Sequence, residues 1–335
     1  MRAVEAVFPL LSQPKKIFIT THYKPDGDAM GSALGLYHYL LQKGHQPTVV
    51  SPSAVPDFLQ WLPGMEQVLN FETDNKICLE RLKDTDLIFC LDFNRLDRIK
   101  QMEQPLRKAP QPKVLIDHHL MPEEEAFQFG ISQPGKSSTC EMVYDFILVD
   151  KGEKYLNQAV MQCLYTGTMT DTGSFRFPAT TASVHKMVAD FKERGLAHSA
   201  IHEEIYDVWS ENRMRLLGFA LYKKMEIFPE ASVGIICLTK DEIEQFQAGT
   251  GDTEGLVNYP LSIAGIKCAV LIIERKDEIK LSFRSKGNKD VSAIARDYFE
   301  GGGHFNAAGG RSSRDMATTY ENVKNALQIT SNIQS

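Results

Sequence analysis

The chain has 335 residues, of which 43% are hydrophobic, and its formal net charge is -6 at pH 7. The length is enough to bury one large core or, as we expect here, two smaller ones. The acidic balance provides no basic field of the kind that long nucleic acid requires, so long DNA or RNA is not an expected partner. No apolar run approaches the roughly 20 residues that span a bilayer, and no secretory cleavage pattern is present. We therefore expect a cytoplasmic globular protein that does not bind membranes.

Short apolar runs alternate with segments of helical period in the first part of the chain. The expected strands are followed by polar residues, and a helix over residues 29–45 ends near Gly44. The strands are predicted at residues 15–22, 46–52, 85–93 and 112–119. Such alternation is typical of a parallel sheet with helices on both faces. We therefore predict an α/β domain here.

The character of the chain changes between residues 220 and 230. The preceding segment from residue 137 is almost wholly of helical period, and strands dominate afterwards. The later elements are a strand at 232–240, a hairpin at 268–285, a helix at 290–302 and a glycine-rich tail. They predict a smaller α/β domain with a mixed sheet.

We place the domain boundary after residue 222, which gives domains of residues 1–222 and 223–335. The basic helical segment 211–225 next to this boundary has two open interpretations. It is either a hinge between the domains or a contact in a homodimer.

Acidic and imidazole side chains follow the predicted strands of the first domain. They are His22, Asp26 and Asp28 after the first strand, Asp92 after the third, Asp117, His118 and His119 after the fourth, and Asp171 after a helix. Ligands of open α/β sheets bind outside the carboxyl ends of the strands, so the strand-linked residues should converge. Asp171 can join them only through tertiary packing.

Four carboxylates in one cleft repel one another, so this cluster needs cations. Carboxylates with one or two imidazoles and no thiolate suit Mn²⁺, and next Mg²⁺ or Fe²⁺, better than a structural Zn²⁺ site. We predict two Mn²⁺ ions, with Mg²⁺ as the alternative. Two such ions activate water and hold a phosphoryl oxygen, so phosphoester or phosphoanhydride hydrolysis is the expected reaction. Gly27, Gly31 and Ser32 are expected to let the loop and the next helix lie close to the metals.

Five segments carry a resemblance to a known family. In chain order they are HYKPDGDAMGS, LDFNRLDRI, IDHH, TDTGSFRF and GGGHFNAAGG. Together they resemble the DHH/DHHA1 phosphoesterase family, specifically its nanoRNase/pAp phosphatase branch, whose members are often called exopolyphosphatase-related. The resemblance covers nearly the whole chain. It implies a catalytic DHH lobe followed by a substrate-binding DHHA1 lobe.

The resemblance also implies roles for the polar residues. One metal would be held by His22, Asp26 and Asp92, and the other by Asp28, Asp92, His118 and Asp171. Asp92 would thus bridge both ions. His119 would orient substrate or water, and Asp117 would support the histidines as a hydrogen-bond acceptor.

A second set of candidates would bind the substrate phosphate. Arg284 ends a predicted strand and can grip a phosphate, and the backbone of Gly301, Gly302 and Gly303, before His304, can approach a ligand closely. The resemblance assigns these positions to the terminal phosphate and base end of a short substrate. Arg176, in the fourth segment, is open between a phosphate contact and a structural ion pair.

The candidates have structural alternatives. The aspartates could cap helices or turns, the paired histidines could be core residues, Arg284 could form a surface salt bridge, and the glycine run could be a mobile turn. Two departures from the family pattern adjoin the expected cleft and bear on substrate preference. They are Phe93 after the second-motif aspartate and the lack of an asparagine in LMPEE after the DHH triplet.

The sequence therefore predicts a Mn²⁺-dependent phosphoesterase for two- to five-nucleotide single-stranded RNAs, which releases mononucleotides, and for pAp, which it converts to AMP. An inorganic exopolyphosphatase or pyrophosphatase would use the same metal chemistry without a base pocket. A RecJ-like exonuclease would need a further nucleic-acid-binding domain and a basic groove. A nucleotide-binding regulator without turnover would be expected to lack a metal ligand.

Overall fold

The computed structural model describes residues 1–249 and 251–329, with His304 described by its backbone alone. The chain divides into two compact units, Met1–Val208 and a second unit that begins at Trp209. The boundary expected after residue 222 lies beyond helix α8 (Glu211–Phe219), whereas the structure divides the chain before this helix. The reason is that Leu216 and Leu217 of α8 belong to the core of the second unit.

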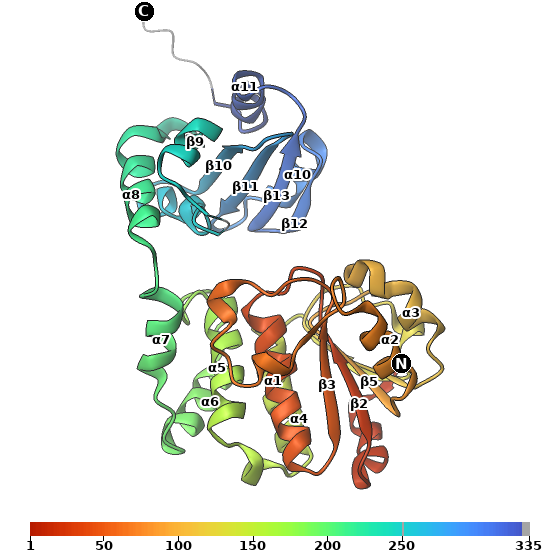
Figure 1. Ribbon diagram of the computed structural model, residues 1–335. Coiled ribbons are helices and arrows are strands. Elements are labelled where there is room, and N and C mark those ends of the chain that lie inside the picture. The colour runs from red at the N-terminus through yellow and green to blue at the C-terminus, as the bar shows by residue number, and fades with distance from the viewer. Residues whose placement is uncertain (250, 330–335) are drawn as a thin grey trace, which may run out of the picture. The chain divides into compact units, whose positions relative to one another are not determined.

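A seven-stranded sheet forms the centre of the first unit (Figure 1). Its order is β1-β7-β6-β5-β2-β3-β4, and each recorded pairing is parallel. The strands are β1 (Arg2–Ala3), β2 (Lys16–Thr20), β3 (Gln46–Ser51), β4 (Leu69–Asn70), β5 (Leu87–Leu91), β6 (Lys113–Asp117) and β7 (Phe129–Ser132). Because β5 lies between β2 and β6, the carboxyl ends of these three strands are neighbours.

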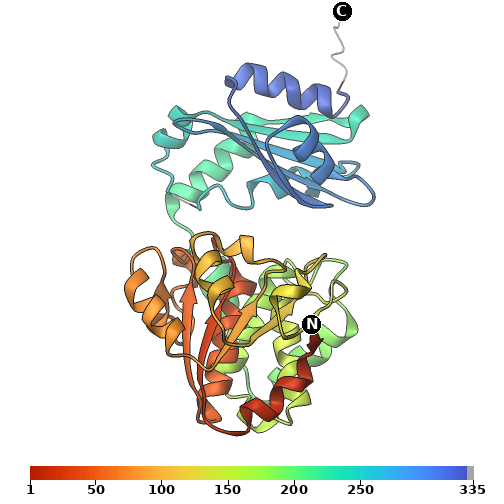
Figure 2. The ribbon, with the colours of Figure 1, turned by 90° about the vertical axis from the view of Figure 1, so that its right-hand side faces the viewer.

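Helices cover both faces of this sheet (Figures 1 and 2). Alternate strand residues point to opposite faces. Ile17 and Ile19 belong to one core cluster with residues of α1, α4 and α5, whereas Phe18 belongs to another with residues of α2 and α3. The helices are α1 (Gly27–Gln42), α2 (Asn75–Lys83), α3 (Glu103–Lys108), α4 (Thr139–Val149), α5 (Gln158–Asp171), α6 (Ala182–Glu193) and α7 (His198–Tyr206). The predicted α/β domain is confirmed.

The second unit has a six-stranded mixed sheet in the order β12-β13-β11-β10-β9-β8. Only the β9–β10 pairing is parallel among its described strands. Its elements are α8, β8 (Met225–Phe228), β9 (Val233–Leu238), α9 (Lys240–Gln245), β10 (Cys268–Glu274), β11 (Ile279–Ser285), α10 (Val291–Tyr298), β12 (Gly302–His304), β13 (Ala307–Ser312) and α11 (Met316–Ala326). The smaller α/β domain is thus confirmed. The glycine-rich tail contributes two strands, and helix α11 follows it.

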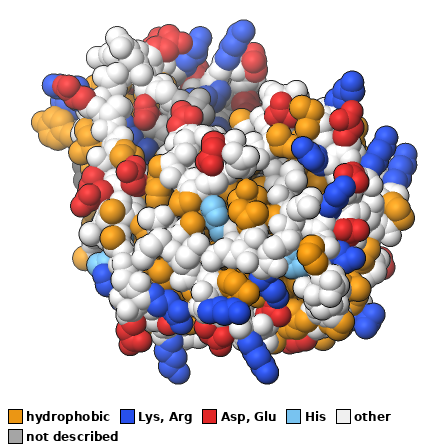
Figure 3. Space-filling model, turned by 60° about the horizontal axis from the view of Figure 1, so that its bottom comes forward, with side chains coloured by type: hydrophobic (Ala, Val, Ile, Leu, Met, Phe, Trp, Pro, Cys, Tyr) orange, Lys and Arg blue, Asp and Glu red, His pale blue; other side chains and the backbone are white. Residues whose placement is uncertain are grey.

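Charged side chains of both signs and hydrophobic side chains share one face of the molecule (Figure 3). On the face shown in Figure 3, the described Lys and Arg side chains lie among Asp and Glu side chains. Within the described residues, no helix is both long enough and apolar enough to cross a bilayer. The six cysteines are free.

Helices α1 and α5 pack closely because glycines line their contact. A Cβ on Gly31 would lie 2.5 Å from the carbonyl oxygen of Cys163, and one on Gly167 would lie 2.9 Å from the Cα of Asp28. Either side chain would force the helices apart. We expected Gly31 to let the helix start close to the metals, and the structure shows that it also lets α1 and α5 pack closely. The close packing brings Asp171, the last residue of α5, toward the start of α1.

Gly31→Ala should therefore destabilise the first unit. The new methyl group meets backbone atoms, and overpacking of this kind costs about 1–3 kcal/mol. Gly218→Ala is the matched control, because this glycine in α8 has no atom within 4 Å of its added Cβ. The control should be neutral or stabilising by up to about 1 kcal/mol through helix propensity. Denaturant unfolding measures both changes, and an unchanged midpoint for Gly31→Ala would contradict the close packing.

Candidate metal centre

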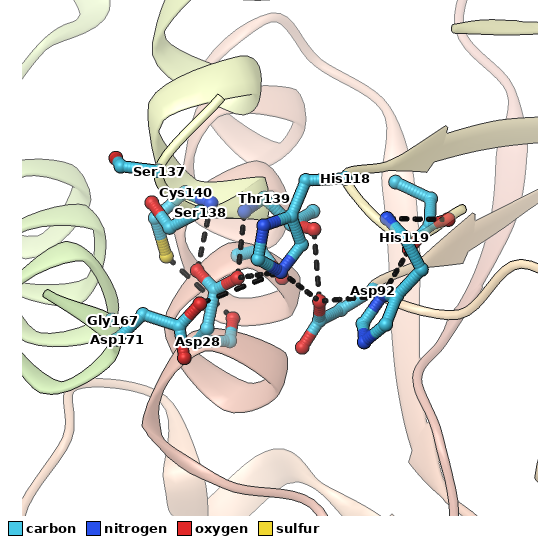
Figure 4. Close-up of polar contacts among 12 residues, drawn as sticks. Asp28, Asp92, His118, His119, Ser137, Ser138, Thr139, Cys140, Gly167 and Asp171 are labelled. Carbon is cyan, nitrogen blue, oxygen red and sulfur yellow. Dashed lines mark hydrogen bonds and ion pairs between the residues drawn. The ribbon is translucent and has the colours of Figure 1, made fainter. Parts of the chain in front are cut away.

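The polar residues that follow three strands meet at one edge of the sheet. His22 follows β2, and Asp92 follows β5. Asp117 is the last residue of β6, and His118 comes directly after it. Because the three strands are parallel neighbours, the segments that follow them leave the same edge. Figure 4 shows Asp92, His118 and His119 here, together with Asp28 and Asp171 from the helices.

The first set of donors, which we call the His22 group, consists of His22, Asp26 and Asp92. Their ligand atoms lie within 4.8 Å of one another. Nε2 of His22 is 3.5 Å from an oxygen of Asp92 and 3.8 Å from one of Asp26. The other oxygen of Asp26 accepts from the backbone N–H groups of Asp28 and Ala29, each at 3.1 Å. Asp26 therefore caps α1 with one oxygen and faces His22 with the other.

The second set, the His118 group, consists of Asp28, His118 and Asp171, whose ligand atoms also lie within 4.8 Å of one another. Nε2 of His118 is 3.4 Å from Asp171, 3.8 Å from Asp28 and 3.5 Å from Asp92. Oδ1 of Asp92 faces His118, and its Oδ2 faces His22. Asp92 thus links the His22 group, to which it belongs, with the His118 group. Its backbone is left-handed (φ 64°), a conformation that Asp tolerates better than most residues.

The N-terminus of α4 holds Asp28, which sequence reasoning missed. The backbone N–H groups of Thr139 and Cys140 donate to its two oxygens at 2.6 and 2.9 Å. The hydroxyl of Thr139 donates to Asp92 at 3.0 Å. Helix N-termini stabilise carboxylates. The S-x-x-E pattern of residues 138–141 signals that a helix starts here, but it does not reveal which carboxylate the helix meets.

Each imidazole of the two groups is oriented through its Nδ1 atom. Nδ1 of His22 lies 3.0 Å from the carbonyl oxygen of Tyr23, and Nδ1 of His118 lies 3.4 Å from that of Lys136. An N–H at Nδ1 can donate to these carbonyls, which directs Nε2 of each ring at the carboxylates. Metal-binding histidines are commonly held in this way.

Asp117 holds His119 but makes no recorded contact with His118 among the described residues. Its buried carboxylate accepts from the backbone N–H of His119 at 3.1 Å and from Nδ1 of the same residue at 2.7 Å. Nδ1 of His119 is also 3.8 Å from Asp92. We expected Asp117 to support both histidines, and the structure instead gives His118 the carbonyl of Lys136.

The carboxylates and imidazoles shift one another's proton affinities. Burial and the charge of Asp92 raise the pKa of Asp28 to about 7. Burial and the charges of Asp28 and Asp92 raise the pKa of Asp171 well above its usual value. Burial alone would lower the pKa of His118, but its carboxylate neighbours raise this pKa to about 10. Burial would also lower the pKa of His22, but its carboxylate neighbours raise this pKa well above its usual value. Burial would raise the pKa of Asp92, but hydrogen bonds from the two histidines hold it below its usual range. Protons thus supply part of the positive charge that the cluster needs.

The donor set fits divalent cations that prefer oxygen and nitrogen ligands. It offers the carboxylates of the two groups and the imidazoles of His22 and His118, and His119 forms a third possible group with Asp92 and His118. The sulfur of Cys140 lies 3.6 Å from the carbonyl oxygen of Asp28, but burial and the charge of Asp28 raise the pKa of its thiol well above the usual value. A neutral thiol is a poor ligand. The cluster can therefore hold Mn²⁺ or Mg²⁺ without a thiolate.

Metal binding should release protons. The pKa of His118 is raised in the folded protein, so the protonated form persists until the pH rises through about 10. Metal ligands bind deprotonated, so a cation must displace this proton and others in the cluster. We expect Mn²⁺ affinity to increase as the pH rises from about 6 to about 9. Calorimetric titrations in two buffers of different ionisation enthalpy test this, and equal heats in both buffers would contradict it.

The two arginine candidates form no recorded ion pair in the part of the chain that the structure describes. Nε of the exposed Arg176 donates to the carbonyl of Gly173 at 2.8 Å. The half-buried Arg284 donates to the carbonyl of Phe283 at 2.9 Å, and burial lowers its pKa. The salt-bridge alternative for Arg284 is thus unsupported among the described residues.

The glycine run of the second unit is not a mobile turn, because residues 302–304 form strand β12. A Cβ on Gly301 would lie 2.1 Å from the carbonyl oxygen of Gly309. One on Gly303, where φ is 148°, would lie 2.6 Å from that of Ala307. Strand pairing alone therefore requires these two glycines, whereas Gly302 faces open space. The side chain of His304 lies outside the described part of the structure.

We expected Phe93 to adjoin the substrate cleft and to affect substrate preference, and this expectation is wrong. This side chain is fully buried in the core cluster that includes residues of α2 and α3, so it cannot line a substrate cleft. The other departure from the family pattern, the segment after the DHH triplet, is exposed at Leu120 and Met121.

Comparisons with known proteins extend over both units. The chain matches the DHH family, N-terminal domain, over residues 16–168 and the DHHA1 domain over residues 233–334. The crystal structure of an exopolyphosphatase-related protein from Bacteroides fragilis is 35% identical, with a TM-score of 0.94, and the match covers 97% of this chain and 95% of that one. 

Two curated relatives are similar over most of their length. The bifunctional oligoribonuclease and PAP phosphatase NrnA of Bacillus subtilis is 28% identical, with 88% of each chain covered. The protein of the same name from Thermus thermophilus is 29% identical, with 98% of this chain and 93% of that protein covered.

Proposed function

The chain belongs to the DHH/DHHA1 family and is a phosphoester hydrolase, and we propose that it cleaves short oligoribonucleotides to mononucleotides and converts pAp to AMP. One observation carries the proposal: Asp92, a member of the His22 group, faces His22 with one carboxylate oxygen and His118 of the His118 group with the other. Relatives named oligoribonuclease and PAP phosphatase, similar over most of the chain, support the choice of substrates.

We assign two divalent cations to the centre, Mn²⁺ by preference and Mg²⁺ as the alternative. The His22 group would hold one, and the His118 group together with Asp92 would hold the other. Bound there, the cations would lower the pKa of water and balance the charge of the phosphate.

The chain itself would keep the site ordered before substrate arrives. The N-terminus of α4 fixes Asp28, and the hydroxyl of Thr139 fixes Asp92. Asp117 sets the orientation of His119, which we assign to the substrate phosphate or the attacking water. Groups that are held in advance need no reorganisation during the reaction.

Substrate binding is assigned to Arg284, Gly301, Gly302, Gly303 and His304 of the second unit and to Arg176 of the first. The support for Arg284 is chemical, because its guanidinium forms no ion pair within 4.0 Å among the described residues, although the charge of Glu254 acts on it, and a guanidinium can bind an anion. The close strand packing at two of the glycines weakens the argument from them. A cytoplasmic location and a homodimer stay predictions.

Inorganic polyphosphate is a second candidate substrate, because the similar Bacteroides fragilis protein is described as exopolyphosphatase-related. The same cation chemistry would serve both kinds of substrate. The regulator without turnover is less well supported, because the expected carboxylates and imidazoles lie close enough together to hold metal ions.

Release of mononucleotides from a labelled RNA ladder with Mn²⁺ tests the proposal, beside pAp, pyrophosphate and polyphosphate as substrates. We expect rapid loss of only the shortest RNAs and of pAp. Asp92→Ala should lower each activity by at least about a thousandfold, because Asp92 serves both donor groups. Phosphate release from polyphosphate without RNA cleavage would overturn the choice of substrate and leave the metal centre standing.

A further inference from the structure

Two large apolar side chains are exposed directly after the DHH triplet. Leu120 is 69% exposed and Met121 is 83% exposed. Single exposed apolar residues are common on protein surfaces, but these two are consecutive and follow His119 at the carboxyl end of β6. Met121 is also in the left-handed region, with φ at 60°, which is unfavourable for a residue other than glycine. We call Leu120 and Met121 the apolar pair.

Hydrogen bonds to Asn94 hold the backbone of the apolar pair. Nδ2 of Asn94 donates to the carbonyl of Leu120 at 2.6 Å and lies 3.4 Å from that of Met121. The carbonyl of Asn94 accepts from the N–H of Glu123 at 2.8 Å. Just before the pair, the hydroxyl of Ser132 donates to the carbonyl oxygen of His119 at 3.0 Å. Asn94 lies two residues after Asp92, so the backbone of the apolar pair is bonded to the segment that follows β5.

Glu123 anchors the far end of the segment. Its carboxylate accepts from the backbone N–H of Leu96 at 3.1 Å and from two nitrogens of Arg107 at 2.6 and 3.1 Å. The hydrogen bonds from Arg107 lower the pKa of Glu123, so the carboxylate stays ionised at neutral pH. The backbone of the apolar pair is therefore held on both sides while its side chains face solvent.

Asn94 makes these contacts at a cost. Its side-chain oxygen Oδ1 is buried without a hydrogen-bond partner among the described residues. An unpaired buried acceptor is unfavourable. A strained methionine, an unpaired amide oxygen and two exposed apolar side chains are all unfavourable for the folded protein alone, and such features gather where a ligand is bound.

We propose that the apolar pair contacts a nucleobase of the substrate and that Asn94 is its positioning residue. The proposal rests on the proposed function, because only a nucleotide substrate brings a base. Nucleobase faces pack on apolar and aromatic surfaces irrespective of base identity, whereas polyphosphate presents only charged oxygens. The apolar pair would thus favour nucleotides over inorganic phosphates without selecting a base sequence.

A double-mutant cycle between protein and substrate tests this. The substrates are a 5′-phosphorylated adenine dinucleotide and two analogues, each with one base replaced by hydrogen. For the wild-type protein, removal of the contacted base should lower kcat/KM about five- to tenfold, mainly through KM. On the complete dinucleotide, the kcat/KM of Leu120→Ser/Met121→Ser should be lower than that of the wild-type protein by a similar factor. For this variant, removal of the contacted base should lower kcat/KM little further.

Three further variants separate base contact from general damage. Ile77→Ser removes another exposed apolar side chain, on α2, and should leave all three substrates unaffected. Met121→Gly suits the left-handed backbone, so it should fold normally and still lose part of the base effect. Asn94→Ala should also lose base discrimination while binding Mn²⁺ normally.

The outcomes distinguish the two proposals. If the wild-type protein hydrolyses the complete dinucleotide and both analogues equally well, the apolar pair does not contact a base, and the proposed function stands. Equal losses on all substrates in Leu120→Ser/Met121→Ser would also overturn the inference. If the wild-type protein cleaves neither the dinucleotide nor pAp, both proposals fail.

Discussion

Repulsion among Asp26, Asp28, Asp92 and Asp171 is the constraint on which the first unit is built. Two of these carboxylates are stabilised by helix N-termini, Asp26 at α1 and Asp28 at α4. Asp92 receives the hydroxyl of Thr139 and faces two imidazoles. Asp171 has the opposite situation, because it ends α5, where the helix dipole disfavours a negative charge. The protein's own groups therefore neutralise the cluster only in part, and divalent cations would complete the balance.

This constraint explains why helix packing matters as much as the strand ends. The parallel strands bring His22, Asp92 and His118 to one edge without special packing. Asp171 reaches the same place only because α5 approaches α1 to within the space that glycines leave, as at Gly31. A carboxylate that we assign to the metal centre is thus positioned by glycines that cannot bind a metal through a side chain.

Sequence patterns predicted the features that depend on side-chain type and local period. Strands β2, β3, β5 and β6 of the first sheet, strands β9, β10 and β11 of the second, and the carboxylate and imidazole cluster were of this kind, because each has a composition that can be read from neighbouring positions. The other strands, β1, β4, β7, β8, β12 and β13, were not predicted. The contact of α4 with Asp28 was missed because every residue except proline carries a backbone N–H, so the sequence does not show that the N–H groups of Thr139 and Cys140 donate to Asp28.

The same limit applies to the segments that follow β5 and β6. Phe93 is buried because of how the chain turns after β5, where Asp92 has a left-handed backbone, and strand period does not encode that turn. The support of Leu120 and Met121 by Asn94 joins segments that follow different strands. Their proximity comes from the strand order of the sheet, which single-sequence periodicity does not determine.

The most direct test of the account is electron paramagnetic resonance of the protein with increasing Mn²⁺. If the two donor groups share the Asp92 carboxylate, the second equivalent of Mn²⁺ should produce the spectrum of two magnetically coupled ions. Asp92→Ala should abolish that coupled spectrum. A wild-type protein that binds one ion, or two ions with independent spectra, would contradict the shared centre.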